Sequence, residues 1–176
     1  MWQIIDGVIP VLLVAGHNAP HLRNGKIKKR DWGTGDMVKY LCEKTGAFGI
    51  ITTEIQIDPN YHEEAELRKE VIKIIGEQEI ELVIDIHGRR ADYPYLIEFF
   101  TNKHFLNEFL KGEMVFKAEV RTQKLLVKAL EIPGVEVEIR KDGRTWGEEN
   151  FEVVINKLEK LINSFAPPLT SPHPLS

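Results

Sequence analysis

Short apolar runs, bounded by glycines or polar residues, recur along the chain and predict buried strands. The longest run covers residues 8–15 (VIPVLLVA) and lies between two glycines. A continuous run of this kind is typical of a strand that is buried on both faces of a parallel sheet. Further runs predict strands over residues 48–53, 82–86 and 95–100. Residues 135–140 (VEVEIR) alternate strictly, which predicts a strand with its apolar side chains on one face.

Segments with apolar residues at every third or fourth position predict helices between these strands. One helix is expected to begin near Thr34 and to end at Gly46. Others are expected over residues 63–78, 120–131 and 148–165. Residues 18–30 are polar and predict a loop between the first strand and the first helix. The alternation of strands and helices favours a three-layer α/β/α fold with a mostly parallel or mixed sheet.

Length and composition are those of one ordinary domain. The chain has 176 residues, of which 43% are hydrophobic and 28% are charged. A chain of this size buries about 70% of its surface on folding, so it needs no disulfide framework. We expect a single α/β domain over residues 1–165, followed by a proline-rich irregular tail over residues 166–176. The single cysteine, Cys42, excludes an internal disulfide and every multi-cysteine metal motif.

Charge and hydropathy narrow the classes of partner. The net charge of −4 gives no general attraction to nucleic acid or to anionic lipid. The basic stretch of residues 23–30 lacks interleaved aromatic residues, so no nucleic-acid partner is expected. The longest apolar run is too short to span a membrane, and the first basic residue is Arg23, so no signal peptide is expected. These features predict a soluble cytoplasmic protein.

Two histidines fall at the ends of predicted strands, His17 after the first strand and His87 after residues 82–86. Ligands of open α/β sheets bind at the carboxyl ends of strands, so the two imidazoles can converge on one metal ion. Asp85 shares a strand face with His87 and can orient that imidazole. The alternative is that each histidine only caps its strand.

Other polar residues nearby also allow two interpretations. Asp31 and Asp36 can supply a carboxylate to the same site, but Asp31 and Thr34 also suit helix capping. Arg89 and Arg90 follow His87 directly; they suit either a substrate carboxylate or a solvated loop.

The polar face of residues 135–140 carries Glu136, Glu138 and Arg140. One interpretation makes this face the wet side of an edge strand. The other makes Glu138 a general acid/base and Arg140 a ligand for an anionic group.

Five short segments, taken in order, resemble the N-formylglutamate amidohydrolase family, a branch of the zinc carboxypeptidase-like hydrolases. The segments are GHNAP at residues 16–20, DWGT at 31–34, DPN at 58–60, DIHG at 85–88 and EIR at 138–140. Their order and rough spacing agree with the family over about residues 8–160. The resemblance implies a phosphorylase/hydrolase-like α/β fold.

The resemblance also implies the chemistry of the site. One divalent metal ion, Zn by analogy with the family, would be held by His17, His87 and Asp31. Glu138 would act as the catalytic acid/base on the attacking water. The implied activity is a metal-dependent amidohydrolase that cleaves the amide of an N-acylated amino acid or a similar small carboxylate substrate.

One residue departs from the family pattern. Tyr61 stands where the family's D-x-N-R segment has arginine. Asn60 remains from that segment as a substrate-binding candidate, and the contact to a substrate carboxylate would pass to Arg89, Arg90 or Arg140. The same departure favours the alternative function, a non-catalytic metal- or small-acid-binding module with the same fold.

Overall fold

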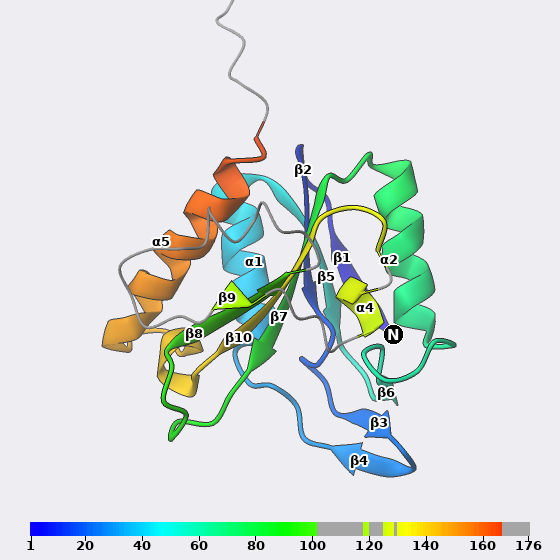
Figure 1. Cartoon of the computed structure of the whole chain (residues 1–176), viewed down its shortest axis with the longest axis horizontal. Helices are drawn as coiled ribbons and strands as arrows, with labels where there is room; N and C mark the ends of the chain where they lie inside the picture. Colours follow the sequence, from blue (N-terminus) through cyan, green and yellow to red (C-terminus); the bar gives the residue numbers. More distant parts are fainter. Residues whose placement is uncertain (102–117, 120–124, 129, 167–176) are drawn as a thin grey trace, which may run out of the picture.

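A mixed β-sheet forms the middle layer of the structure, a computed structural model that describes residues 1–101, 118–119, 125–128 and 130–166. The seven strands lie in the order β1-β5-β2-β7-β10-β8-β9 (Figure 1). Their bounds are β1 Trp2–Ile5, β2 Ile9–Ala15, β5 Ala47–Thr52, β7 Leu82–Gly88, β8 Ile97–Thr101, β9 Ala118–Glu119 and β10 Gly134–Ile139. The central strands β5, β2, β7 and β10 are parallel. Strand β1 runs antiparallel to β5, and β8 runs antiparallel to β10 but parallel to β9.

Helices cover both faces of this sheet, so the expected three-layer α/β/α fold is confirmed (Figure 1). Helices α1 (Thr34–Thr45) and α5 (Glu149–Asn163) lie on one face, and α2 (Glu66–Glu77) and α4 (Leu125–Lys128) lie on the other. A hydrophobic core lies on each face of the sheet. Strand β2 contributes Leu13 to the core beneath α1 and α5, and Leu12 to the core beneath α2 and α4. This is the two-sided burial that its continuous apolar run predicts. Among the described residues, no helix has the length and apolar character needed to cross a bilayer.

Most predicted elements are present with small shifts of their ends. Helix α1 begins at Thr34 as expected, and α2 begins three residues later than predicted. The helix predicted over residues 120–131 is described only as α4, because residues 120–124 and 129 lie outside the described residues. Residues 167–176 of the predicted tail also lie outside them.

The loop predicted for residues 18–30 is wrong, because it contains a β-hairpin. Strands β3 (His21–Arg23) and β4 (Lys26–Lys28) pair with each other, and β6 (Gln56–Ile57) completes a second, three-stranded sheet. Asn24 and Gly25 both have positive φ, as a two-residue hairpin turn requires. The apolar side chains of this hairpin are exposed, so hydrophobic alternation gives no signal there.

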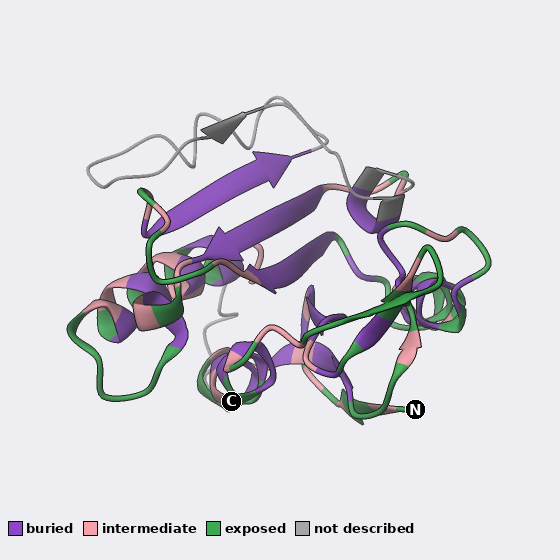
Figure 2. Cartoon of the chain, turned by 90° about the horizontal axis from the view of Figure 1, so that it is seen from below, coloured by how far each residue is buried: buried purple, intermediate pink, exposed green. Residues whose placement is uncertain are grey.

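Strand β10 lies inside the sheet, so the edge-strand interpretation of residues 135–140 is wrong. It pairs in parallel with β7 on one side and antiparallel with β8 on the other. Glu136 and Glu138 are each only 3% exposed as a result. Figure 2 shows the same burial along the strands of the sheet, with exposed residues concentrated in the loops and the outer faces of the helices.

Candidate active site

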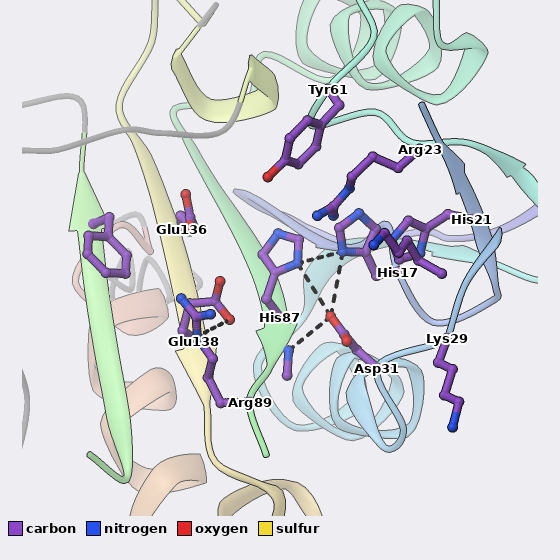
Figure 3. A pocket seen from close by; sticks show the side chains of 13 residues that line it. His17, His21, Arg23, Lys29, Asp31, Tyr61, His87, Arg89, Glu136 and Glu138 are labelled. Carbon is purple, nitrogen blue, oxygen red and sulfur yellow. Dashed lines mark hydrogen bonds and ion pairs between the residues drawn. The ribbon is translucent and has the colours of Figure 1, made fainter. Parts of the chain in front are cut away.

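The site lies where three neighbouring parallel strands end. His17 comes two residues after the end of β2, His87 is the last but one residue of β7, and Glu138 is the last but one residue of β10. In the β7–β10 register, Asp85 lies opposite Glu136 and His87 lies opposite Glu138, so these four side chains share one sheet face. A cavity of about 350 Å³ opens over this edge (Figure 3).

Three of its lining side chains converge as metal ligands would. Nδ1 of His17 lies 3.1 Å from Nδ1 of His87, and each of these atoms lies 3.6 Å from Oδ2 of Asp31. Zinc with bonds of roughly 2.0–2.1 Å holds tetrahedral ligand atoms about 3.3–3.5 Å apart. The structure therefore brings together the three residues expected as ligands, at separations that suit one divalent ion.

Two buried carboxylates contact the imidazole nitrogens that face away from Asp31. Nε2 of His17 lies 2.9 Å from Oδ1 of Asp58, and Nε2 of His87 lies 2.7 Å from Oδ2 of Asp85. Each carboxylate favours the tautomer that carries its proton on Nε2 and turns the Nδ1 lone pair toward Asp31. Two lone pairs and a carboxylate then face one another, and a cation between them removes their mutual repulsion.

Asp58 has a role that the sequence did not reveal. Its place in a DPN turn was the only local signal, and it does serve that turn, because Oδ1 also accepts a hydrogen bond from the Asn60 backbone N–H at 2.9 Å. Burial alone would raise the pKa of Asp58, but hydrogen bonds with His17, Asn60 and Arg23 outweigh it and hold the pKa well below its usual range. Asp58 is therefore a permanent anion behind His17.

Asp31 is fixed to both histidine segments through its backbone and its side chain. Its N–H donates to the carbonyl of His17 at 2.8 Å, and its Oδ2 accepts from the N–H of Gly88 at 3.1 Å. Burial would raise the pKa of Asp31, but the neighbouring imidazoles of His17 and His87 outweigh burial and place it well below the ordinary range. Asp31 is therefore ionised at neutral pH, as a metal ligand must be.

The capping alternative for Asp31 is not what the structure shows. The N-cap position of α1 is Gly33, and no side chain caps it there. Asn18 instead reaches across from the loop after β2, and its Oδ1 accepts from the N–H of Gly35 at 3.1 Å. Asp36 lies in the first turn of the same helix and is exposed, outside the ligand cluster.

The other predicted residues divide between the cavity and its surroundings. Glu138 lines the cavity, and its Oε2 lies 3.2 Å from Nε of Arg89, which lines the same wall (Figure 3). Arg90 does not line the cavity; it is exposed and pairs with Asp92. Of the two arginines after His87, only Arg89 reaches the site.

Arg140 and Asn60 also lie away from the cavity surface. Arg140 donates through Nε and Nη2 to the carboxylate of Asp142, at 2.7 and 2.8 Å. Asn60 is buried behind the histidines, where its Nδ2 lies 3.3 Å from both Oδ2 of Asp85 and Nε2 of His87. The structure therefore places Asn60 as a brace for the site and does not bring Arg140 to it.

A buried arginine ties together the three loops that carry the site. The guanidinium of Arg144 donates to the carbonyls of Ile139 at the end of β10, Arg89 after β7 and Trp32 beside Asp31. Burial lowers the pKa of Arg144. Gly88 lets it approach, since a Cβ there would lie 2.5 Å from the guanidinium carbon. No local sequence pattern pointed to this residue.

The opposite side of the cavity is basic and aromatic. The hairpin β3–β4 contributes Arg23, Lys28 and the adjoining Lys29, and Tyr61 lies beside them. Nε of Arg23 donates to Oδ2 of Asp58 at 2.7 Å, and its guanidinium carbon lies 3.8 Å from the centre of the Tyr61 ring. Sequence reasoning assigned no role at the site to these three cations; the Asn24-Gly25 turn could have indicated the hairpin that positions them.

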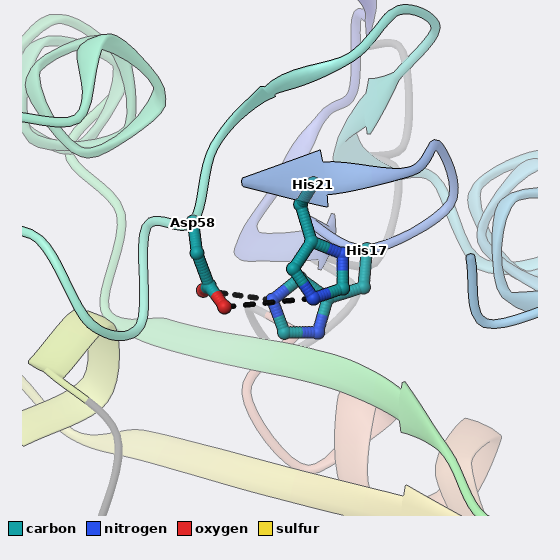
Figure 4. Close-up of side chains that lie close together, drawn as sticks. All are labelled: His17, His21 and Asp58. Carbon is teal, nitrogen blue, oxygen red and sulfur yellow. Dashed lines mark hydrogen bonds and ion pairs between the residues drawn. The ribbon is translucent and has the colours of Figure 1, made fainter. Parts of the chain in front are cut away.

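His21 extends the histidine cluster (Figure 4). Its ring stacks on that of His17 with centroids 3.8 Å apart, and its Nε2 lies 3.5 Å from Oδ2 of Asp58. Burial, followed by the nearby His17, lowers the pKa of His21 to about 4. His21 is therefore neutral at pH 7. Asp58 already bonds to His17 and Arg23. We therefore interpret the cluster of His17, His21 and Asp58 as a set of contacts that holds the His17 ring in position.

Comparison with known proteins connects this architecture to solved structures. No protein-family model and no curated protein sequence matches the chain. A gene product of Agrobacterium tumefaciens is 17% identical with a TM-score of 0.64, over 93% of this chain and 92% of that one. N-formylglutamate amidohydrolase from Ralstonia eutropha is 10% identical with a TM-score of 0.58, over 93% and 97%. A bacteriophage poly-gamma-glutamate hydrolase is 13% identical with a TM-score of 0.53, over 90% and 86%.

These likenesses extend over nearly the whole of each chain, at identities that establish the fold alone. The five sequence segments resembled N-formylglutamate amidohydrolase, and the structure has that enzyme's fold. The resemblance inferred from the sequence is confirmed at the level of the fold: the chain has the same α/β architecture as this solved structure.

Proposed function

We propose that the protein is a metal-dependent amidohydrolase that cleaves the amide of an N-acylated amino acid or a similar small carboxylate substrate. His17, Asp31 and His87 hold one divalent ion, for which zinc is the best match. The observation that carries this proposal is the convergence of two Nδ1 atoms and a carboxylate oxygen at 3.1–3.6 Å. The buried carboxylates behind both imidazoles support it, since zinc-binding histidines commonly have such partners.

The fold neighbours support the class of bond. The names of two of them, N-formylglutamate amidohydrolase and poly-gamma-glutamate hydrolase, both refer to hydrolysis of compounds of glutamate. A bound divalent ion supplies Lewis acidity, which lowers the pKa of a coordinated water and polarises a carbonyl. The protein's own residues must then orient the substrate and move one proton.

Glu138 is the residue that moves the proton. It takes a proton from the water that attacks the amide carbon and delivers it to the nitrogen as the carbon–nitrogen bond breaks. Its position beside His87 in the β7–β10 register and its place on the cavity wall support this role. The ion pair with Arg89 holds its carboxylate in place.

The decisive experiment compares two neighbouring glutamates on β10. We expect zinc-loaded Glu138→Gln to retain its metal, because Glu138 is not a ligand. It should lose turnover of an N-acyl amino acid by about 10²–10⁴-fold, the usual contribution of a positioned acid/base. Glu136→Gln, two residues away on the same face, should lose much less. Metal content and hydrolysis of a panel of N-acylated amino acids are the measurements.

Two outcomes would contradict this proposal. Full activity in Glu138→Gln would remove its catalytic role. A parent protein that binds zinc with one ion per chain but hydrolyses nothing in the panel would favour the non-catalytic binding module.

A further inference from the structure

The small sheet of β4, β3 and β6 carries apolar side chains on the face that is turned away from the cavity (Figure 1). In the strand register Leu22 lies opposite both Ile27 and Ile57, so these three residues form one row across the sheet. Leu22 is 37% exposed, Ile27 68% and Ile57 40%. The alternate residues of β3, His21 and Arg23, point to the other face and line the active-site cavity. We call Leu22, Ile27 and Ile57 the outer apolar row.

This orientation is the reverse of the usual one for a small sheet. A sheet with one wet face normally turns its polar side chains to water and its apolar side chains to the core. Here the polar face is occupied by the active site, and the apolar face is left in water. Apolar residues that are contiguous on a surface, rather than scattered, mark a place where something else binds.

A hollow of about 530 Å³ adjoins the outer apolar row at Ile57. Its lining combines apolar and acidic side chains: Met1, Trp2, Glu54, Gln56, Ile57 and Glu66. The carboxylate of Glu54 lies 3.8 Å from the amino group of Met1, and that of Glu66 lies 2.6 Å from Nζ of Lys69. Both contacts are between exposed groups, and such pairs are weak. The two glutamates can therefore pair with a cation of a bound partner.

The opposite edge of the small sheet is basic. On β4 the exposed side chain of Ile27 lies between those of Lys26 and Lys28, which are also exposed. This edge thus presents one apolar side chain between two positive charges. The hollow beside β6 presents an apolar surface with two negative charges. The two edges of one sheet are therefore complementary in shape and in charge.

Two copies of the chain can use this complementarity at the same time. A two-fold axis through Leu22 would place Leu22 against its equivalent and Ile27 of each copy against Ile57 of the other. The same rotation would bring the lysines of each β4 next to the acidic hollow of the other copy. An interface of this type is isologous and closes after two copies.

We propose that the outer apolar row is the interface of a homodimer, in which Ile27 of each copy enters the hollow beside Ile57 of the other. The charge complementarity of the two sheet edges favours a second copy of this chain as the partner. The two glutamates of the hollow disfavour an anionic lipid surface. Because the other face of the hairpin lines the cavity, the dimer holds one wall of the active site in place. Dimerisation does not depend on the proposed catalytic function.

The first test is the oligomeric state of the full chain. Specific complexes dissociate in the micromolar range or below, so sedimentation equilibrium from about 1 to 100 µM should show a reversible dimer. Ile27→Glu should raise the dissociation constant at least about 10-fold, because it buries an unpaired carboxylate at two symmetric positions. Val8→Glu is the matched control. Val8 is 85% exposed and lies just before β2, at the end of that strand farthest from the hairpin, so this variant should dimerise like the parent.

The second test exchanges the charges of the two edges. Lys26→Glu/Lys28→Glu and Glu54→Lys/Glu66→Lys should each weaken the dimer at least about 10-fold, because like charges then face each other. An equimolar mixture of the two variants should recover dimers. In the mixed pair the reversed hairpin of one chain faces the reversed hollow of the other, and the unchanged edges also match. A variant that fails to fold cannot be rescued in this way.

Three results would overturn the proposal. The first is a parent that stays monomeric at about 100 µM, whether the outer apolar row then binds another protein or nothing. The second is a dimer that survives Ile27→Glu unchanged, because its interface then lies elsewhere. The third is a mixture of the two charge variants that remains as monomeric as each variant alone.

Discussion

His17 contacts several parts of the site at once. One ring nitrogen faces the ligand position, the other bonds to Asp58, and the ring face stacks on His21. Its carbonyl also accepts the N–H of Asp31. A single residue just past the end of β2 therefore joins the proposed metal ligands to the β3–β4 hairpin.

The contact between His17 and Asp58 gives a prediction at the residue scale. Asp58→Asn should lower zinc affinity by about 10–100-fold, the usual effect of removing the partner of a metal-binding histidine. The charge behind Nε2 is lost while the shape of the side chain is kept. Competition with a chelator of known affinity measures the change. Asp36→Asn, at the exposed start of α1, is the control, and equal losses in both variants would contradict the assignment.

Cys42 gives a second prediction at this scale. Burial against β5 raises the pKa of its thiol to about 12. At pH 8 only about one thiol in 10⁴ is then ionised, and the thiolate is the reactive form. We expect the native protein to resist an aromatic disulfide reagent and to react with one equivalent when unfolded in guanidinium. Rapid stoichiometric labelling of the native protein would contradict this.

At the scale of the elements, a comparison of two glycines distinguishes the cost of backbone strain from the cost of steric crowding. Gly33 and Gly147 have nearly the same φ, 83° and 84°. A Cβ on Gly147 would meet no atom within 4 Å, whereas one on Gly33 would meet the carbonyl oxygen of Arg144. Gly33 also lies two residues from Asp31, so its displacement would move a ligand.

Alanine at both positions should therefore be destabilising, but unequally. Gly147→Ala should lower the free energy of unfolding by about 1–2 kcal/mol through its left-handed backbone alone. Gly33→Ala should lower it by at least about 1 kcal/mol more, because crowding is added to strain. It should also weaken zinc binding. Urea unfolding measures the first effect and chelator competition the second. Equal stabilities of the two variants would show that the Arg144 contact gives way without cost.

The elements also show what a sequence can reveal. Helices and buried strands can be predicted from the hydrophobic period. Residues at or just past the end of a strand, such as His87 and His17, are then positioned by that strand. Asp85 follows because two residues on a strand share a face. The hairpin was missed because its apolar residues, Leu22 and Ile27, are exposed and its turn was its only signal.

The residues that sequence analysis missed act over long distances along the chain. Arg144 contacts the carbonyl of Trp32, 112 positions away, and Asp58 contacts His17, 41 positions away. Neither separation leaves a local pattern. Arg90 and Arg140 failed to reach the cavity for the converse reason: each has an acidic neighbour two positions on, Asp92 and Asp142, that binds it first.

At the scale of the whole molecule, metal binding should stabilise the fold. Only the folded chain brings His17, Asp31 and His87 together, so zinc at 100 times its dissociation constant should add about 2.7 kcal/mol to the free energy of unfolding. For a chain of this size that corresponds to roughly 5–10 °C in the unfolding temperature. Thermal unfolding with zinc and with EDTA measures it. His87→Ala is the control, and a zinc-dependent rise that persists in this variant would place the ion elsewhere.

The order of the strands has a consequence for how the molecule assembles. Strands β7 and β8 follow each other in the sequence, but β10, made more than thirty residues later, lies between them. The gap can close only after that late segment arrives, and contacts between distant segments slow folding. A nascent chain that ends before Gly134 therefore holds all three proposed metal ligands yet lacks Glu138 and one of the two strands that pair with β7. Insertion of β10 between β7 and β8 is therefore the step that completes the pairing of both strands and brings the proposed acid/base beside the proposed ligands.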